Sequence, residues 1–190
     1  MSVRYGARVV DAGPVAAVPH AVRVVVSGAP GTGKSTVGAR LADALCIPLL
    51  SLDVIKEALA DVLGVDGEDW SNRLGDAAAE VVFRLARECP QVVVEGWWRR
   101  ERRERAIIEF GGWDEVFCSC DPLLAEQRMR ERAGQQRHSI HRDVINPGLL
   151  DSVAETVRTA TPLGLGAMLV IMNTDQGVSA EAIVSQLMPS

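Results

Sequence analysis

The segment 24–42 has the residue types and the spacing of a phosphate-binding loop. Gly28, Gly33, Lys34 and Ser35 fit the pattern G-x-x-x-x-G-K-(S/T). In this pattern backbone N–H groups surround phosphate oxygens, the lysine reaches the β- and γ-phosphates, and the hydroxyl contacts Mg²⁺. The chemistry indicated is therefore the binding of a nucleoside triphosphate together with Mg²⁺.

The surroundings of this loop support the same interpretation. An apolar, strand-like run (22–27) precedes it and a helix-like segment (35–45) follows it, which is the context that the pattern requires. The N-terminus of that helix adds partial positive charge at the phosphates. We expect ATP as the donor and keep GTP as an alternative. The predicted nucleotide-binding residues are Gly28, Ala29, Pro30, Gly31, Thr32, Gly33, Lys34, Ser35 and Thr36.

Three acidic residues lie at or just after later apolar runs. Asp53 is the candidate base or orienting group for an acceptor hydroxyl, and its alternative role is to cap the helix that starts there. Glu95 is the candidate for holding Mg²⁺ through water or for binding substrate hydroxyls, unless it is only a solvated strand end. Asp121 stands before Pro122 and is expected to cap a helix rather than to act in catalysis.

The segment 125–143 is basic within an acidic protein. Arg128 and Arg132 are four residues apart, which puts them on one face of a helix, and Arg137 follows. We predict that these arginines close over the nucleotide, with Arg128 and Arg132 just before a short lid at about 133–146 and Arg132 stabilising the transferring phosphoryl group. The alternative is a solvated basic face, which we prefer for Arg130. For His138 and His141, hydrogen bonding within the lid is favoured over zinc binding.

The elements needed to position these residues follow from hydrophobic periodicity. Five short apolar runs separated by helical patterns predict a parallel, doubly wound sheet, with ligands bound at the carboxyl ends of its strands. The expected fold is α/β, a three-layer P-loop NTPase fold with a five-stranded parallel sheet and a short helical lid. Residues 21–190 form the kinase-like domain and residues 1–20 an extension. The runs are 22–27, 47–52, 91–95, 116–120 and 168–172.

Residues 28–36, Asp53 and the Arg128–Arg132 pair together resemble the P-loop kinases of the nucleoside-monophosphate-kinase type. Among these, the chain looks similar to chloramphenicol phosphotransferase and the zeta-toxin kinases. The resemblance covers residues 22 to about 187, but only the phosphate-binding loop is highly specific. It implies that Asp53 is the catalytic base, that Arg128 packs on the nucleobase and that Arg132 contacts phosphates.

The acceptor site departs from the nucleoside-monophosphate kinases. Those enzymes hold a phosphorylated acceptor with arginines, whereas the segment after Asp53 offers Lys56 and no arginine, so an unphosphorylated hydroxyl acceptor is favoured. Trp97 and Trp98, with Trp70 nearby, are expected either to line an acceptor pocket or simply to pack in the core. The arginines of 99–105 alternate with glutamates and are expected to form a solvated helix face.

Composition restricts the partners and the compartment. A net charge of −5 and a pI near 5.3 argue against a nucleic-acid surface. No apolar run approaches the roughly 18–20 residues of a membrane span. The four cysteines (Cys46, Cys89, Cys118 and Cys120) lack the spacing of zinc ligands, and the first three are expected to be buried, reduced thiols. We expect a cytoplasmic monomer or homodimer whose partner is a small molecule.

The function that these residues indicate is a small-molecule kinase. It would transfer the γ-phosphate of ATP or GTP to a hydroxyl of a metabolite, nucleoside, sugar or antibiotic, and in the last case would confer resistance. The alternatives are a nucleotide-dependent regulatory ATPase or switch, and a nucleoside-monophosphate kinase.

Overall fold

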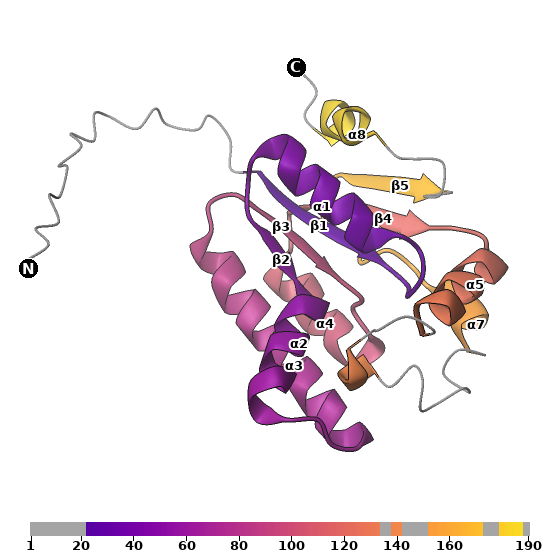
Figure 1. Ribbon diagram of the computed structural model, residues 1–190. Coiled ribbons are helices and arrows are strands. Elements are labelled where there is room, and N and C mark those ends of the chain that lie inside the picture. The colour runs from indigo at the N-terminus through magenta and orange to yellow at the C-terminus, as the bar shows by residue number, and fades with distance from the viewer. Residues whose placement is uncertain (1–21, 134–137, 142–151, 173–178, 188–190) are drawn as a thin grey trace, which may run out of the picture.

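The computed structural model describes residues 22–133, 138–141, 152–172 and 179–187 (Figure 1). Strands and helices alternate along these residues. The strands are β1 (Arg23–Gly28), β2 (Leu49–Ser51), β3 (Val92–Gly96), β4 (Asp114–Ser119) and β5 (Met168–Met172). The helices are α1 (Lys34–Leu45), α2 (Leu52–Leu63), α3 (Glu68–Glu88), α4 (Arg100–Glu109), α5 (Pro122–Ala133), the 3-10 helix η1 (Ser139–His141), α7 (Val153–Thr159) and α8 (Ala180–Leu187).

The sheet is parallel throughout and its strand order is β2-β3-β1-β4-β5. β1 lies between β3 and β4, with Val26 opposite Glu95 on one side and Val116 on the other. The loop after β1 therefore leaves from the middle of the sheet, at the point where the chain switches from one side to the other. This arrangement confirms the predicted α/β fold with five parallel strands.

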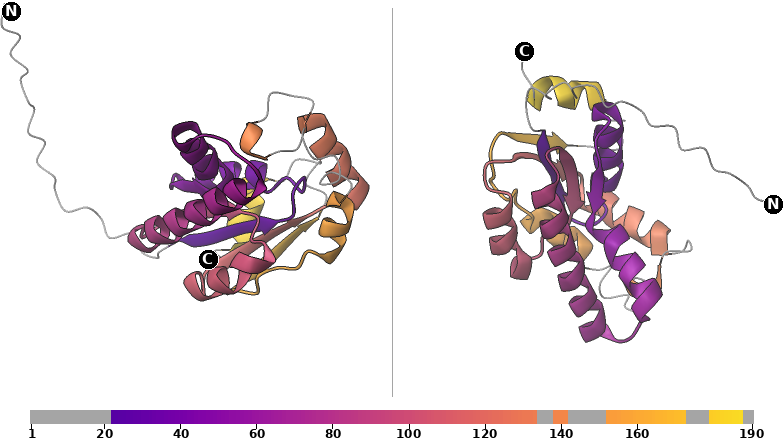
Figure 2. Two further views of the ribbon diagram at one scale, coloured as in Figure 1. Left: turned by 90° about the horizontal axis from the view of Figure 1, so that it is seen from below. Right: turned by 90° about the vertical axis from the view of Figure 1, so that its left-hand side faces the viewer.

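Helices cover both faces of the sheet, which makes three layers (Figure 2). Along β1, Val24 and Val26 face a core formed with α1 and α8, whereas Val25 faces a second core formed with α3 and α4. Such continuous valine runs are typical of strands that are buried on both faces. The carboxyl ends of the strands are left for the loops, where a ligand can bind.

Trp98 belongs to the second core. It is only 3% exposed and stacks on Phe83, with 5.5 Å between the ring centroids, while Phe110 meets it edge-on at 5.2 Å. The expectation that Trp98 helps to line an acceptor pocket beside Trp97 is therefore corrected in favour of its alternative, packing. The physical reason is that two consecutive residues after a strand point in opposite directions, and only one of them can face the cavity.

Glu115 is a buried acid whose role no local sequence pattern indicates. It has no exposed surface, and it accepts hydrogen bonds from Ser27 Oγ (2.6 Å) and from the backbone N–H groups of Leu163 and Gly164 (2.8 Å each). Three donors on one carboxylate offset the cost of burying it. Glu115 thus connects β4 to β1 and to the segment that leads into β5.

Several expectations concern residues outside the described ranges. The extension 1–20, Arg137 and most of the lid predicted at 133–146 lie there, so only η1 represents the lid. Within the described ranges, no helix is both long and apolar enough to cross a membrane.

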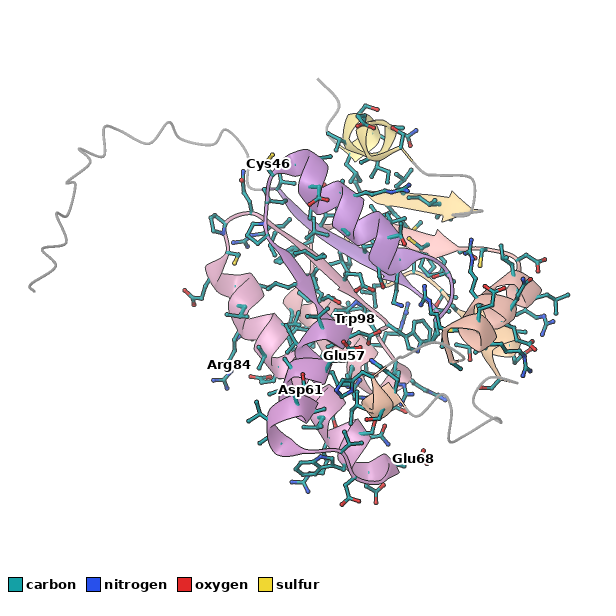
Figure 3. The ribbon with its side chains drawn as sticks, in the orientation of Figure 1. Cys46, Glu57, Asp61, Glu68, Arg84 and Trp98 are labelled. Carbon is teal, nitrogen blue, oxygen red and sulfur yellow. The ribbon has the colours of Figure 1, made fainter. Side chains whose placement is uncertain are left out.

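Cys46 is exposed, not buried as expected, because it forms the C-cap of α1 at the surface, where Figure 3 labels it.

Candidate active site

The loop between β1 and α1 has the backbone of a phosphate cradle. Gly28, Gly31 and Gly33 have φ angles of 149°, 81° and 86°, a region that favours glycine. A Cβ atom on Gly28 would lie 2.5 Å from the carbonyl oxygen of Cys118, and one on Gly31 would lie 2.5 Å from that of Ala125. The loop is therefore closely packed between β4 and α5 and needs glycine at both positions.

A buried group of polar side chains lies at the start of α1. Lys34 is 5% exposed and its Nζ is 3.7 Å from Oε1 of Glu95, which is 1% exposed. Glu95 also accepts hydrogen bonds from Ser35 Oγ (3.1 Å) and from Ser51 Oγ (2.8 Å). The carboxylate is thus neither solvated nor at a loose strand end, and it faces the lysine and the hydroxyl of the phosphate-binding motif.

These side chains fit Mg²⁺ and a triphosphate. Mg²⁺ is held by oxygen ligands and usually keeps several waters, and the Ser35 hydroxyl and the Glu95 carboxylate are adjacent oxygen groups. Lys34 supplies positive charge at the position that the motif assigns to the β- and γ-phosphates. The α1 N-terminus points its unpaired N–H groups toward the same place.

A cavity of about 410 Å³ opens beside the phosphate-binding loop. The residues that line it come from the loops after β1 and β3, from the start of α1, and from α2, α3, α4, α5, α7 and η1. Of the predicted site residues, it is lined by Pro30, Lys34, Asp53, Lys56, Trp97 and Arg132. Glu95 and Trp98 are buried behind its wall.

Asp53 is not the N-cap of α2. The helix begins at Leu52, so the N-cap position falls on Ser51, whose hydroxyl is bonded to Glu95 instead of capping the helix. Asp53 lies in the first helical turn and is half-buried, on the wall of the cavity that also contains Lys34. Asp53 therefore does not act as the helix cap that was its alternative role. As a carboxylate in the first turn, it still interacts favourably with the helix dipole.

Helix α5 presents its arginines in different directions. Arg128 Nη1 donates a hydrogen bond to the carbonyl oxygen of Gly31 (3.2 Å), and Arg132 reaches the cavity wall. Arg130 pairs with Glu126 on the exposed face, at 2.9 Å, as expected for a solvated residue. At the start of the helix, Asp121 Oδ1 accepts the N–H groups of Leu123 and Leu124, so its expected capping role is confirmed.

The 3-10 helix η1 is docked on α2 and α3. Ile140 has no exposed surface and packs with Ala60 and Leu74. His138 Nε2 is 3.0 Å from Oδ1 of Asp61, and His141 Nε2 is 2.6 Å from Oε1 of Glu57. Figure 3 shows Glu57 and Asp61 on α2 near η1. The histidines therefore form hydrogen bonds between the lid segment and α2, and His141 reaches the cavity wall.

Three arginines near the start of α4 line the cavity, which their sequence pattern does not predict. Arg99, Arg100 and Arg102 line the cavity, although the alternation of charges in 99–105 suggested a solvated face. Arg102 is fixed by Asp76 Oδ1, 2.6 Å from its Nε, and by the backbone carbonyl of Asn72. Its guanidinium lies over Gly75 of α3, where a Cβ atom would come within 2.7 Å of Nη2. A glycine in the middle of a predicted helix was the one available signal, since it weakens a helix unless something packs against it.

Cys118 lies behind the phosphate-binding loop and is not a reactive group. Burial raises the pKa of the Cys118 thiol from 9.0 to about 12, despite the opposing effect of Lys34 nearby. The side chain is fully buried under Gly28. Cys118 therefore stays protonated and serves to pack the loop against β4.

The fold and this loop define the class of the protein, a P-loop protein with a kinase-like architecture. The chain belongs to the AAA domain family, which matches residues 24–148. It is 44% identical over 59 residues to shikimate kinase from Mycobacterium tuberculosis (strain ATCC 25177 / H37Ra), covering 28% of this chain and 34% of the relative. The chain thus matches about a third of the length of its curated relatives.

Solved structures resemble the chain over most of its length. A proposed kinase from Chloroflexus aurantiacus j-10-fl has a TM-score of 0.73 and 28% identity, covering 86% of this chain and 95% of that one. A gluconokinase from Sinorhizobium meliloti 1021 has a TM-score of 0.54 and 21% identity, covering 88% and 90% respectively. The second comparison supports the fold alone.

Proposed function

We propose that this protein is a kinase that transfers the γ-phosphate of ATP to a hydroxyl group of a small molecule. The observation that carries the proposal is that Lys34 and Asp53 line one cavity, from the starts of α1 and α2, which follow β1 and β2 at the carboxyl edge of the sheet. A cation for the phosphates and a carboxylate for the acceptor proton are the two groups that such a transfer needs. The curated relatives are named shikimate kinases, and these names agree with an alcohol acceptor.

In the proposed reaction the acceptor oxygen attacks the γ-phosphorus while the bond between that phosphorus and the β,γ-bridging oxygen breaks. ADP leaves, and the hydroxyl proton passes to the Asp53 carboxylate. Lys34 and Arg132 stabilise the negative charge on the phosphoryl oxygens, and Arg128 holds the loop at Gly31 beside the nucleotide. Mg²⁺, held at Ser35 and Glu95, would neutralise phosphate charge when bound.

Several finer points belong to this proposal. ATP is the donor and GTP the alternative, and Trp97 and Lys56 contact the acceptor. Acceptors include metabolites, sugars, nucleosides and hydroxylated antibiotics, the last in line with the resemblance to chloramphenicol phosphotransferase. The enzyme would act in the cytoplasm, where ATP is supplied, as a monomer or homodimer.

The test is a screen of hydroxylated compounds with ATP and Mg²⁺, read as acceptor-dependent ADP release and as phosphorylated product by mass spectrometry. Asp53→Asn should bind ATP nearly normally and lower transfer by at least about a hundredfold, because general-base loss costs about 10² to 10⁴ in rate. Lys34→Ala should abolish transfer. Asp43→Asn, which alters an exposed aspartate on α1, is the matched control and should transfer at the wild-type rate.

Two results would contradict the proposal. Full transfer activity of Asp53→Asn would remove Asp53 from the chemistry and direct attention to Glu95. ATP hydrolysis that no acceptor changes, together with nucleotide-dependent binding of a protein, would instead identify a regulatory ATPase or switch.

A further inference from the structure

The cavity is strongly cationic although the protein is acidic. The chain carries a net charge of −5, yet the described residues that line the cavity include six cations and only two carboxylates. The carboxylates are Asp53 and Glu101, and the cations are Lys34, Lys56, Arg99, Arg100, Arg102 and Arg132. A triphosphate bound at the loop would neutralise the two cations near the donor, Lys34 and Arg132. The other four lie at the acceptor end, among α2, α3 and α4.

The protein itself holds three of these four. Lys56 Nζ donates to Ser71 Oγ (2.8 Å), and Arg102 is bound to Asp76 and Asn72, with its side chain only 15% exposed. Asn72 Oδ1 also accepts a hydrogen bond from Arg99 Nη1 at 3.3 Å. The side chains of α3 thus hold Arg99 and Arg102 in place along the cavity wall.

Arg99 and Arg100 differ from the other arginines of α4. Arg105 pairs with Glu109 at 2.7 Å, and Arg103 donates to two backbone carbonyls. Within the part of the chain that the structure describes, by contrast, neither the Arg99 nor the Arg100 side chain pairs with a carboxylate or donates to a backbone carbonyl. Both are exposed, and they occupy the N-cap and the first position of the helix.

This position is unfavourable for a cation in the free protein. The N-terminus of a helix carries partial positive charge, so arginines there are repelled by the dipole unless an anion is bound. Arginine presents a planar fork of N–H donors that matches a carboxylate or a phosphate. The combination of a cavity, adjacent arginines and a helix N-terminus therefore favours an anionic ligand.

On the basis of the kinase function proposed above, we propose that the acceptor is a hydroxylated anion, whose carboxylate or phosphate-ester group binds at Arg99 and Arg100 beside Asn72. Its hydroxyl would then face Asp53 across the cavity. The absence of arginine after Asp53 suggested an acceptor without phosphate, but the arginines that follow β3 supply the charge that such a group needs.

The test compares matched pairs of probes on the full chain. The first pair is gluconate and sorbitol, which differ in a carboxylate, and the second is glucose 6-phosphate and glucose. Isothermal titration is done with the loop filled by Mg²⁺ and a non-hydrolysable ATP analogue, so that the probes do not bind there. At least one anion should bind at least about tenfold more tightly than its neutral partner, the effect of one charge-assisted hydrogen bond.

The variants assign that preference to the arginines. The double variant Arg99→Gln and Arg100→Gln should lower the affinity for the anion by about tenfold or more and leave that for the neutral partner unchanged. Arg130→Gln, which removes an arginine from the exposed face of α5, is the matched control and should retain wild-type affinity. If the gluconate and sorbitol pair shows the larger difference in affinity, the group recognised is a carboxylate. If the glucose 6-phosphate and glucose pair shows it, the group is a phosphate ester.

Each outcome has a separate meaning. Equal affinities within both pairs, including no binding by any probe, would contradict the anion site. So would an anion preference that survives in the double variant. Failure of the ATP analogue to bind would instead contradict the proposed kinase function. The analogue binds at Lys34 and the phosphate-binding loop, so this result would say nothing about Arg99 and Arg100.

Discussion

Glu95→Gln should destabilise the protein because it leaves the buried Lys34 ammonium without a carboxylate. The two side chains are 7% and 1% exposed, and Glu95 is the acid that the structure sets 3.7 Å from Nζ. Removing one partner of a buried ion pair costs about 3–5 kcal/mol. We take about 3 kcal/mol of unfolding free energy, because Lys34 lines the cavity, where water reaches it. For a chain of this size that lowers Tm by roughly 6–12 °C.

Differential scanning calorimetry with and without ATP checks this reasoning. ATP phosphates replace the missing carboxylate beside Lys34, so ATP should raise Tm more in Glu95→Gln than in the wild type. Glu115→Gln is the matched control: it alters another fully buried glutamate, should also lower Tm, and should show only the wild-type gain with ATP. A Glu95→Gln variant that melts within about 2 °C of the wild type would refute the argument.

Three further predictions concern separate parts of the structure. Arg132→Ala should slow transfer, whereas Arg128→Ala should mainly weaken ATP binding by releasing Gly31; equal, negligible effects in both assays would make α5 a solvated helix only. Ile140→Ala should lower the unfolding free energy by about 2 kcal/mol, the lower end for such a truncation, and denaturant titration that detects no loss would show that η1 is not docked. Iodoacetamide at pH 8 should label Cys46 and spare Cys118, whose pKa of about 12 leaves almost no thiolate; labelling of Cys118 in the native protein would contradict its burial.

Local patterns explain what could be predicted from the sequence. Runs such as 91–95 indicate buried strands because their valines cover both faces, and the order of strands and helices then restricts the fold to a parallel, doubly wound sheet. The phosphate-binding loop is a contiguous motif whose glycine spacing reflects backbone angles, so Lys34 and Ser35 were predictable. That Asp53 faces the cavity follows from the strand that precedes it.

Residues whose roles depend on distant partners were not predictable in this way. Arg102 is largely covered because Gly75 leaves room for its guanidinium on another helix, and no local feature of 99–105 contains that information. Glu115 stands just before an apolar run, beside Asp114, and its donors come from segments remote in sequence. The local pattern of Trp97 and Trp98 is the same for both residues, and only the packing of α3 decides which one is buried.

The hydrogen bond between Ser51 and Glu95 has a consequence for how the two halves of the cavity communicate. Ser51 ends β2 two residues before Asp53, and the same carboxylate accepts from Ser35 at the phosphate-binding loop. If Mg²⁺ and ATP rearrange Glu95 on binding, the start of α2, where the acceptor would be held, would move with it. Linkage makes such coupling reciprocal, so the acceptor would change the affinity for ATP by the same factor as ATP changes the affinity for the acceptor. The pair of substrates would then show cooperative, not independent, binding.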